Sequence, residues 1–473
     1  MMRSLFSGVA GLKTHQTRMD VIGNNIANVN TVAYKSSNAT FQELMYQTTA
    51  NASAANAETG RGGINPKQIG LGTSLGAINT NITAAGASQT TGNATDLQIS
   101  GDSFFIVSDG STNYFTRAGA FYIDGAGNLA MTSNGFTVMG WQPNEATKDN
   151  PDDVIVNNVS KLQVMAPDNL VSAPERTSRA YLDGVIDKND PAVSSDDGRL
   201  VNISVYDALG YNYIVQASIT DYADGDATKT KLGEGMYNIA IKKVLNSDGV
   251  DIMHDGTTNL TATIGGAAAA AISFDPKTGQ IITPAAPGTL DIQFGAQVAA
   301  LGSVQEPEDA TTGVGAGVVR LDLKTLTMYD NNGTSTVAGH GGTKDGGYKG
   351  RKMGKMSGIA IQQDGKIYGS YDNGTTKLLG QIAVANFANP SGLEKVGDNL
   401  YSPTQNSGEF DGIGKDITAD GAGKMNSGVL EMSNVDLSAE FTDMITTQRG
   451  FQANSRIITV SDSMIEELVN LKR

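Results

Sequence analysis

Residues 23–35 read GNNIANVNTVAYK and place four asparagines, Asn24, Asn25, Asn28 and Asn30, within seven residues. They close an amphipathic pattern whose apolar stripe has no local partner. Asparagine tolerates the left-handed conformation that ends helices, and its amide bonds backbone groups or other amides. We therefore interpret Asn24, Asn25 and Asn28 as residues that close the helix and set its register at an interface. A solvated polar cap is the alternative.

The apolar residues before these asparagines recur with the period of a helix that carries a coiled-coil-like seam. Over residues 3–28 the pattern predicts a helix about 40 Å long, at 1.5 Å per residue. The seam and the residues beside it are Leu5, Val9, Leu12, Met19, Ile22 and Ile26.

The C-terminal residues 436–473 repeat this pattern and contain no proline, and Asp436 or Ser438 can cap the start of the helix. The apolar positions are Leu437, Phe441, Met444, Phe451, Ile458, Ile465 and Leu468. Each terminal helix could pack on its own neighbouring domain, as amphipathic helices usually do. Their shared period and mildly complementary charges favour pairing of the two termini, within one chain or between copies.

The composition argues against several classes of function. The 473 residues include no cysteine, so disulfides, thiolate metal sites and cysteine nucleophiles are absent. A net charge of −15 argues against binding to nucleic acid or to an anionic membrane. No stretch has the roughly eighteen apolar residues of a membrane helix. The first twenty residues lack the apolar core of a secretory signal, so we expect any export to occur without a cleaved signal peptide.

The interior of the chain divides by composition. Residues 36–95 are small and polar, which predicts a linker or a region that orders on assembly. Short apolar or alternating runs with Asp-Gly and Asn-Gly turns predict β-hairpins before and after residues 150–345. That middle region has strand-like runs of its own. We predict a mixed, mainly β, nested multi-domain chain with two β-rich domains and paired terminal α-helices that form a coiled-coil domain.

No pattern supports catalysis, a cofactor or a metal. The three histidines lack metal-ligand spacing, and residues 313–318, GVGAGV, lack the full dinucleotide fingerprint. The Asp-rich turns at 221–226 and 246–251 do not complete a calcium loop and are interpreted as ordinary turns. Glycines interleave the basic residues of 344–355, which favours a solvated loop over a nucleic-acid patch. We therefore predict a protein that is not an enzyme, with no catalytic, cofactor-binding or metal site.

Several segments resemble the bacterial flagellar axial proteins, the rod and hook family. The specific part of the N-terminal signature is NNIANVNT followed by the aromatic–lysine pair Tyr34–Lys35. Similar blocks are GNATDLQISGDSFFIV in the first β region and LEMSNVDLSAEFTDMITTQRGFQANSRII near the C-terminus. The resemblance covers roughly residues 1–149 and 346–473.

The resemblance implies a layered subunit. Its terminal helices would form the inner coiled-coil layer of a tube around an export channel. The implied domains are a terminal helical domain (1–30 with 428–473), a linker ordered on assembly (31–71), a middle β domain (72–148 with 347–427) and an outer inserted β domain (149–346).

The size of the inserted region distinguishes the members of this family. Hook subunits carry a large middle domain, whereas distal rod proteins generally lack one, so the resemblance favours a hook subunit. Such a subunit self-assembles into a helical tube, a flexible universal joint that transmits motor torque to the filament. A distal rod protein, part of a straight drive shaft in the basal body, is the alternative. A secreted binding or hydrolytic module within 150–345 is a third hypothesis.

The resemblance also implies partners and a location. The implied partners are further copies of the chain, the distal rod protein, the hook cap and hook–filament junction proteins, and the flagellar type III export apparatus. The implied location is extracellular, in the hook and basal body of the flagellum. No nucleic acid, membrane or cofactor is expected.

Overall fold

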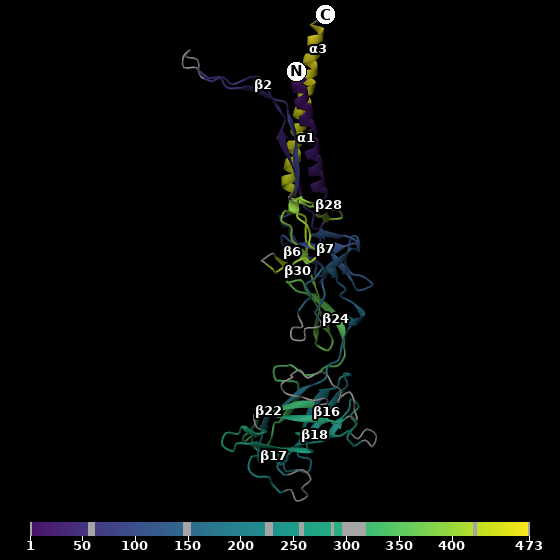
Figure 1. The fold of residues 1–473 in the computed structure, drawn as a ribbon, viewed down its shortest axis with the longest axis vertical. Helices are drawn as coiled ribbons and strands as arrows, with labels where there is room; N and C mark the ends of the chain where they lie inside the picture. The colour runs from purple at the N-terminus through teal and green to yellow at the C-terminus, as the bar shows by residue number, and fades with distance from the viewer. Residues whose placement is uncertain are drawn as a thin grey trace. The chain divides into compact units, whose positions relative to one another are not determined.

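The computed structural model describes residues 2–54, 62–144, 153–222, 230–254, 260–284, 288–295, 318–419 and 423–471. A long helix lies near each end of the chain, α1 (Met2–Ala27) and α3 (Leu437–Asn470), and most elements between them are strands (Figure 1). The predicted fold class is confirmed. None of the described helices is long and apolar enough to cross a membrane.

The chain forms two compact units. The first contains residues 1–169, 358–370 and 376–473, and the second contains residues 170–357 and 371–375. The second unit is thus inserted into the first. The finer division into four domains stays a prediction, and the GVGAGV stretch lies outside the described residues.

Local signals in the sequence set the bounds of both helices. The carboxylate of Asp436 accepts hydrogen bonds from the backbone N–H groups of Ser438 and Ala439, so Asp436 is the predicted N-cap of α3. At the end of α1, the N–H of Asn28 still donates to the carbonyls of Asn24 and Asn25 before the helix ends.

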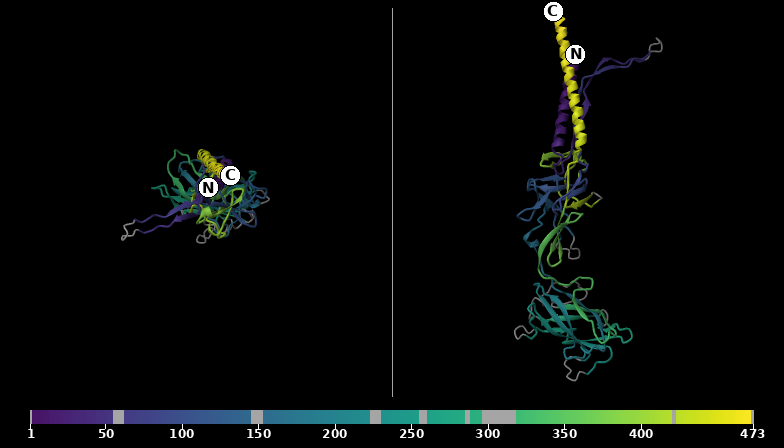
Figure 2. Two further views of the ribbon diagram at one scale, coloured as in Figure 1. Left: turned by 90° about the horizontal axis from the view of Figure 1, so that it is seen from above. Right: turned by 180° about the vertical axis from the view of Figure 1, so that it is seen from behind.

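In the first unit, a long ribbon follows α1. Its strands are β1 (Ser37–Glu43), β2 (Tyr46–Ala50), β3 (Lys67–Gly70) and β4 (Thr73–Thr80). β1 pairs with β4 and β2 pairs with β3, both antiparallel. We call residues 45–54 and 62–71 the arm. Figure 2 shows the arm directed away from α1 and α3.

The rest of the first unit brings together strands from both ends of the chain. The strands before the insertion are β5 (Ser88–Thr90), β6 (Leu97–Gly101), β7 (Phe104–Ser108), β8 (Asn113–Thr116), β9 (Phe121–Ile123), β10 (Leu129–Met131), β11 (Thr137–Trp141) and β12 (Ser160–Lys161), followed by the 3-10 helix η1 (Pro167–Asn169). Those after it are β25 (Lys366–Tyr371), β26 (Thr376–Ile382), β27 (Val384–Ala385), β28 (Glu394–Gly397), β29 (Leu400–Ser402), β30 (Gly423–Ser427) and β31 (Val429–Glu431), with the 3-10 helix η2 (Pro390–Gly392).

Pairing between these two sets holds the unit together. β5 pairs with β31, β6 with β30, β7 with β27, β8 with β29 and β11 with β26. A buried cluster behind these strands contains the single tryptophan, Trp141, together with Phe104, Phe115 and Tyr401. Residues far apart in sequence therefore share one core, as expected for a nested chain.

The second unit is a sandwich of two five-stranded sheets. One has the order β18-β21-β22-β14-β23 and the other β15-β16-β17-β19-β20. The strands are β14 (Arg179–Ile186), β15 (Arg199–Tyr206), β16 (Asn212–Thr220), β17 (Met236–Leu245), β18 (Ala262–Ile264), β19 (Ala269–Phe274), β20 (Ile281–Thr283), β21 (Thr289–Phe294), β22 (Val318–Met328) and β23 (Ala338–Gly341).

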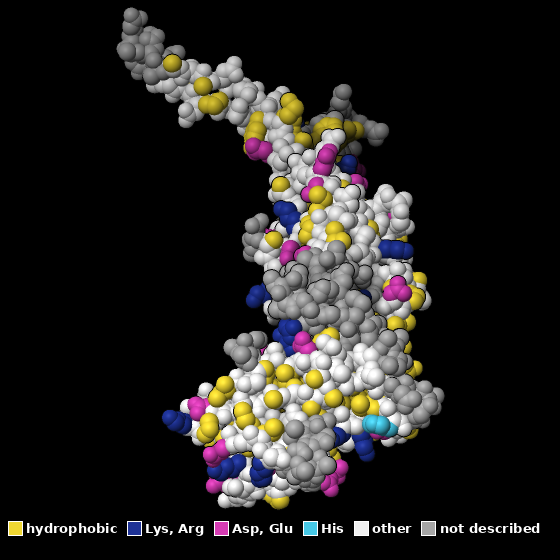
Figure 3. Space-filling model, turned by 60° about the horizontal axis from the view of Figure 1, so that its bottom comes forward, with side chains coloured by type: hydrophobic (Ala, Val, Ile, Leu, Met, Phe, Trp, Pro, Cys, Tyr) yellow, Lys and Arg dark blue, Asp and Glu magenta, His cyan; other side chains and the backbone are white. Residues whose placement is uncertain are grey.

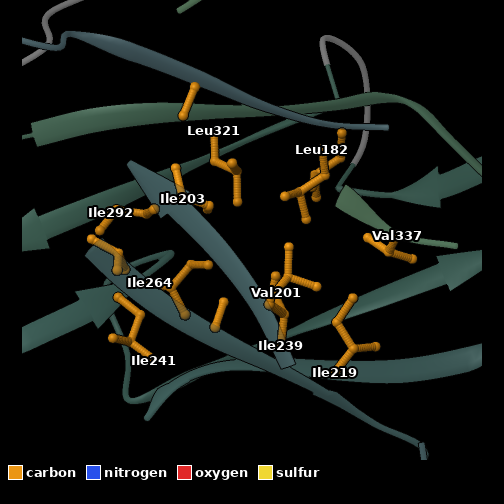
Figure 4. Packing of buried hydrophobic residues seen from close by; sticks show 14 of the residues in the cluster. Leu182, Val201, Ile203, Ile219, Ile239, Ile241, Ile264, Ile292, Leu321 and Val337 are labelled. Atoms are coloured by element: carbon orange, nitrogen blue, oxygen red, sulfur yellow. The ribbon is translucent and has the colours of Figure 1, made fainter. Parts of the chain in front are cut away.

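Aliphatic side chains from both sheets fill the space between them. Leu182 and Leu321 come from one sheet, and Val201, Ile203 and Ile239 come from the other (Figure 4). The short strand β13 (Val171–Ser172) pairs with β24 (Gly354–Ile361) where the chain enters and leaves this unit. The strand-like runs of the sequence thus form a separate core.

Candidate assembly site on the terminal helices

Helices α1 and α3 pack against each other through small residues. A Cβ atom on Gly8 would lie 3.3 Å from Cγ1 of Ile458, and one on Gly11 would lie 2.7 Å from the side-chain nitrogen of Asn454. Later residues of α1 contact earlier residues of α3, so the two helices are antiparallel. Glycine lets the helices approach closely, and larger side chains here would push them apart.

The next contact along the pair involves His15. A Cβ on Gly450 would lie 2.7 Å from its imidazole ring, and the ring packs edge-on against Phe41 at a centroid distance of 5.7 Å. Burial, with the positive charge of Arg18 as a second cause, lowers the pKa of His15 from its ordinary value. Arg18 itself donates to the carboxylate of Asp443 on α3 at 3.0 Å.

Asn25 joins three segments at the end of α1. Its side chain is 1 % exposed. Its amide N–H₂ donates to the carbonyl of Ser37 and to the carboxylate of Glu440 on α3, both at 2.8 Å. Its amide oxygen accepts from the N–H of Ser37 and from the hydroxyl of Tyr34. An amide with all four bonds made fixes the register of α1, α3 and β1.

The other two asparagines of the motif act locally. The amide N–H₂ of Asn28 donates to the backbone carbonyl of Asn24 at 2.9 Å and to its side-chain oxygen at 2.8 Å. The hydroxyl of Thr31 donates to the side-chain oxygen of Asn28. These bonds close the C-terminal end of α1 within the chain.

Lys35 leads from the motif into a buried ion pair. Its ammonium group lies 2.7 Å from a carboxylate oxygen of Glu431 and donates to the carbonyl of Ala84 at 2.6 Å. The same carboxylate oxygen accepts from the N–H of Gly86. Burial lowers the pKa of Lys35, and the bond to Glu431 opposes that effect. Three segments of the chain, around Lys35, Gly86 and Glu431, therefore meet at this carboxylate.

Arg117 completes this buried charge cluster. One of its terminal nitrogens lies 3.8 Å from the second carboxylate oxygen of Glu431, and its guanidinium lies over the ring of Phe104 at 5.1 Å. Burial lowers the pKa of Arg117 and raises the pKa of neighbouring Tyr401 to about 12. The motif indicated Lys35, but sequence reasoning missed Glu431 and Arg117, because no local pattern links residues so far apart.

The structure divides the predicted interface residues by their exposure. Ile22 and Asn25 are buried. The half-buried residues are Leu5, Leu12, Met19, Ile26, Asn28, Met444, Phe451, Ile458 and Ile465. The exposed ones are Val9, Asn24, Leu437, Phe441 and Leu468. The contact between α1 and α3 within the chain thus leaves part of the predicted seam uncovered.

Further apolar side chains lie open on the same helices. They are Phe6, Ile445, Ile457, Val460, Met464, Val469 and Leu471. The register explains those near the end of α3: Gly8 lies beside Ile458, so roughly the last two turns of α3 extend beyond the start of α1. Sequence reasoning missed the glycine contacts, which a search for recurring small residues could have found.

In the described part of the chain, no three His, Cys, Asp or Glu side chains lie close enough together to hold a metal ion.

Three family models match the chain. They are the "Flagella basal body rod protein" model over residues 5–35, the "Flagellar hook protein FlgE/F/G D1 domain" model over 98–173, and the "Flagellar basal body rod FlgEFG protein C-terminal" model over 426–471. The first and third lie over the two terminal helices. The chain is thus an axial protein of the bacterial flagellum.

Full-length relatives identify the family within that class. The flagellar hook protein FlgE of Borreliella burgdorferi is 37 % identical and that of Treponema pallidum 34 %, each with 100 % of both chains covered. The solved structure of the Helicobacter pylori flagellar hook protein FlgE2 has 14 % identity and a TM-score of 0.45, covering 73 % of this chain and 100 % of that one. The chain belongs to the flagellar hook protein family and is a subunit of the self-polymerising hook.

Proposed function

We propose that the terminal helices are the surface through which copies of this chain polymerise. The observation that carries this proposal is the set of large apolar side chains left open on a helix pair that is already packed. Val9 is 54 % exposed, Phe441 51 % and Leu468 50 %. Large exposed apolar patches mark interaction sites, and in a self-polymerising family the available partner is another copy.

The polymer follows from the geometry of such contacts. A surface that meets a different surface on the next copy, without closing into a ring, builds a helical assembly. We propose that this assembly is a tube with α1 and α3 in its inner layer and the inserted 149–346 domain outside. Of the residues predicted for the interface, Ile22 and Asn25 are buried within the chain. The residues that we propose contact another copy are the remaining ones: Leu5, Val9, Leu12, Met19, Asn24, Ile26, Asn28, Leu437, Phe441, Met444, Phe451, Ile458, Ile465 and Leu468.

The proposed mechanical role is that of a flexible universal joint that transmits motor torque to the filament. Its bending requires contacts between copies that slide without breaking. We also propose that the chain contacts the distal rod protein, the hook cap and the hook–filament junction proteins, and that the flagellar type III apparatus exports it without a cleaved signal. This part of the proposal rests on membership of the family.

Phe441 provides a direct test. Phe441→Asp places a charge on the open face of α3, whereas Phe441→Leu keeps that face apolar. We expect Phe441→Asp to abolish polymer formation, measured by sedimentation and electron microscopy, with unchanged circular dichroism of the free chain. Phe441→Leu should assemble. Normal assembly of Phe441→Asp would contradict the proposal.

The position of the insertion can be tested on intact cells with antibody raised against residues 150–345. We expect immuno-electron microscopy to show label on a short curved segment between the cell surface and the filament. Label that appears only after the envelope is removed would instead place the chain in the rod.

A further inference from the structure

The arm is an unusually open structure for a folded chain. Every residue of β2 and β3 is exposed, and the two strands pair only with each other. The pairing register also shifts between Thr48 and Ala50. An isolated two-stranded ribbon is at best marginally stable in water. The arm therefore lacks, among the described residues, the covering layer that its length requires.

The inner part of the ribbon is held on α1 in a way that the arm is not. The hydroxyls of Thr14 and Thr73 lie 3.3 Å apart. Gly72, with a φ of +120°, lies so close to α1 that a Cβ atom would be 3.1 Å from Cβ of Ala10 and 3.2 Å from Cα of Ser7. Only glycine tolerates both this backbone conformation and this approach. The ribbon thus touches α1 as far as Gly72, and the arm begins there.

One face of the arm carries the apolar side chains of Met45, Ile69 and Leu71, with Gln47 among them. The N–H of Leu71 donates to the carbonyl of Met45, and Gln47 lies opposite Ile69. Because side chains alternate between the two faces of a ribbon, Met45 and Ile69 lie on the same face. Met45 is 79 % exposed and Ile69 45 %. Figure 3 shows hydrophobic side chains spaced along the arm.

We infer that this apolar face docks on a second copy of the chain, against the open stripe of α3 formed by Val460, Met464 and Leu468. The inference rests on the proposed function, since it needs the polymer to bring copies together. Both surfaces carry large apolar side chains that are exposed in the single chain. Docking would remove the apolar side chains of both surfaces from water.

The charges of the two surfaces are complementary. Lys67 is the one charged residue among the described residues of the arm. The last turns of α3 carry Asp462, Glu466 and Glu467, all exposed. Opposite charges at the rim of an apolar contact orient the partners and disfavour other arrangements. Such a contact also links two copies through the arm, in addition to any contact between their helix pairs.

Cysteine cross-linking tests this contact, because the natural chain contains no cysteine. Ile69→Cys and Leu468→Cys are made as separate chains, mixed, polymerised and mildly oxidised. We expect a disulfide-linked heterodimer in the polymer and none in the unpolymerised mixture at equal concentration. The matched control is Gln68→Cys, on the opposite face of the arm. Its yield with Leu468→Cys should be roughly tenfold lower, because a disulfide needs Cα atoms within about 7 Å.

Three results would overturn the inference. Dimers linked through two copies of Ile69→Cys would show that arms pair with arms. Equal maleimide reactivity of Ile69→Cys in free chain and polymer would show that the arm stays open. If the cysteine variants do not assemble, hydrogen exchange can be measured on polymer of the unsubstituted chain. We expect the amides of β2 and β3 to exchange more slowly in that polymer than in the free chain. Unchanged exchange in an intact polymer would refute the arm contact alone and leave the helix interface standing.

Discussion

Substitution of Glu431 by glutamine is the most informative single change in the first unit. The carboxylate of Glu431 is 1 % exposed and lies 2.7 Å from the ammonium group of Lys35 and 3.8 Å from the guanidinium of Arg117. Glutamine keeps the size of the side chain and can still accept a bond from the N–H of Gly86. It removes the negative charge and leaves two buried cations without their counter-ion.

The expected loss can be estimated from comparable buried pairs. Breaking a buried ion pair by removal of one partner costs about 3–5 kcal/mol. The ability of Lys35 to release its proton limits the loss, because burial already lowers its pKa. Lys35→Met alone leaves Glu431 with Arg117. The double variant Lys35→Met/Glu431→Gln should lose less than the sum of the single losses, by about 1 kcal/mol or more.

The single tryptophan makes the assay specific for this unit. Trp141 lies in the same buried cluster as Phe104 and Tyr401, which surround Arg117. Its fluorescence in urea therefore follows unfolding of the first unit. With a slope of about 2 kcal/mol per molar urea, we expect the midpoint for Glu431→Gln to fall by about 2 M.

Two results would refute this reasoning. A midpoint change for Glu431→Gln worth less than about 1 kcal/mol would mean that water or flexible neighbours compensate the two cations. Strict additivity of the Lys35 and Glu431 substitutions would mean that the two groups do not interact as an ion pair.

Three further predictions concern single side chains. Asn25→Ala removes four hydrogen bonds and should cost about 2–4 kcal/mol, seen as faster hydrogen exchange around the end of α1, whereas Asn24→Ala should change it little. Because the pKa of His15 is lowered in the folded chain, the unfolded chain binds a proton at His15 more readily. The packing of α1 on α3 should therefore weaken as the pH falls below about 6.5. His15→Gln should remove that part of the pH dependence of the melting temperature. Ile239→Ala leaves a cavity in the second unit and should lower the free energy of unfolding of that unit by about 2–5 kcal/mol. The urea midpoint of the first unit, followed by Trp141 fluorescence, should not change. If the urea midpoints of both units shift, the two units unfold together.

The sequence was sufficient for the features that depend on local patterns. Period and capping residues predicted both terminal helices, and of the two candidate N-caps of α3, Asp436 and Ser438, the structure has Asp436. Asp-Gly and Asn-Gly turns predicted a mainly β interior around an inserted region. These features can be predicted from the sequence because each depends on residues only a few positions apart.

The remaining features depend on pairing over long distances. Heptads of large apolar residues suggested the seam but did not indicate that Gly8, Gly11 and Gly450 also lie in the contact between α1 and α3 within the chain. A helical period does not say which stripe faces which partner. Likewise, 396 positions separate Lys35 from Glu431, and the two segments lie side by side through the hydrogen bond from the N–H of Ala33 to the carbonyl of Glu431.

The segment 36–95 shows a similar limit. Its small, polar residues predicted a linker or a region that orders on assembly, and the structure contains β1, β2, β3 and β4 there, paired in an exposed ribbon. Small polar residues give no apolar alternation from which to predict these strands. Ordering of this segment on assembly stays a prediction.

Electron cryo-microscopy of isolated hooks built from this chain would test the central claim most directly. We expect α1 and α3 in the innermost layer, with Val9, Phe441 and Leu468 covered by side chains of neighbouring copies. A map in which these three residues face open solvent, while other surfaces join the copies, would contradict assembly through the terminal helices.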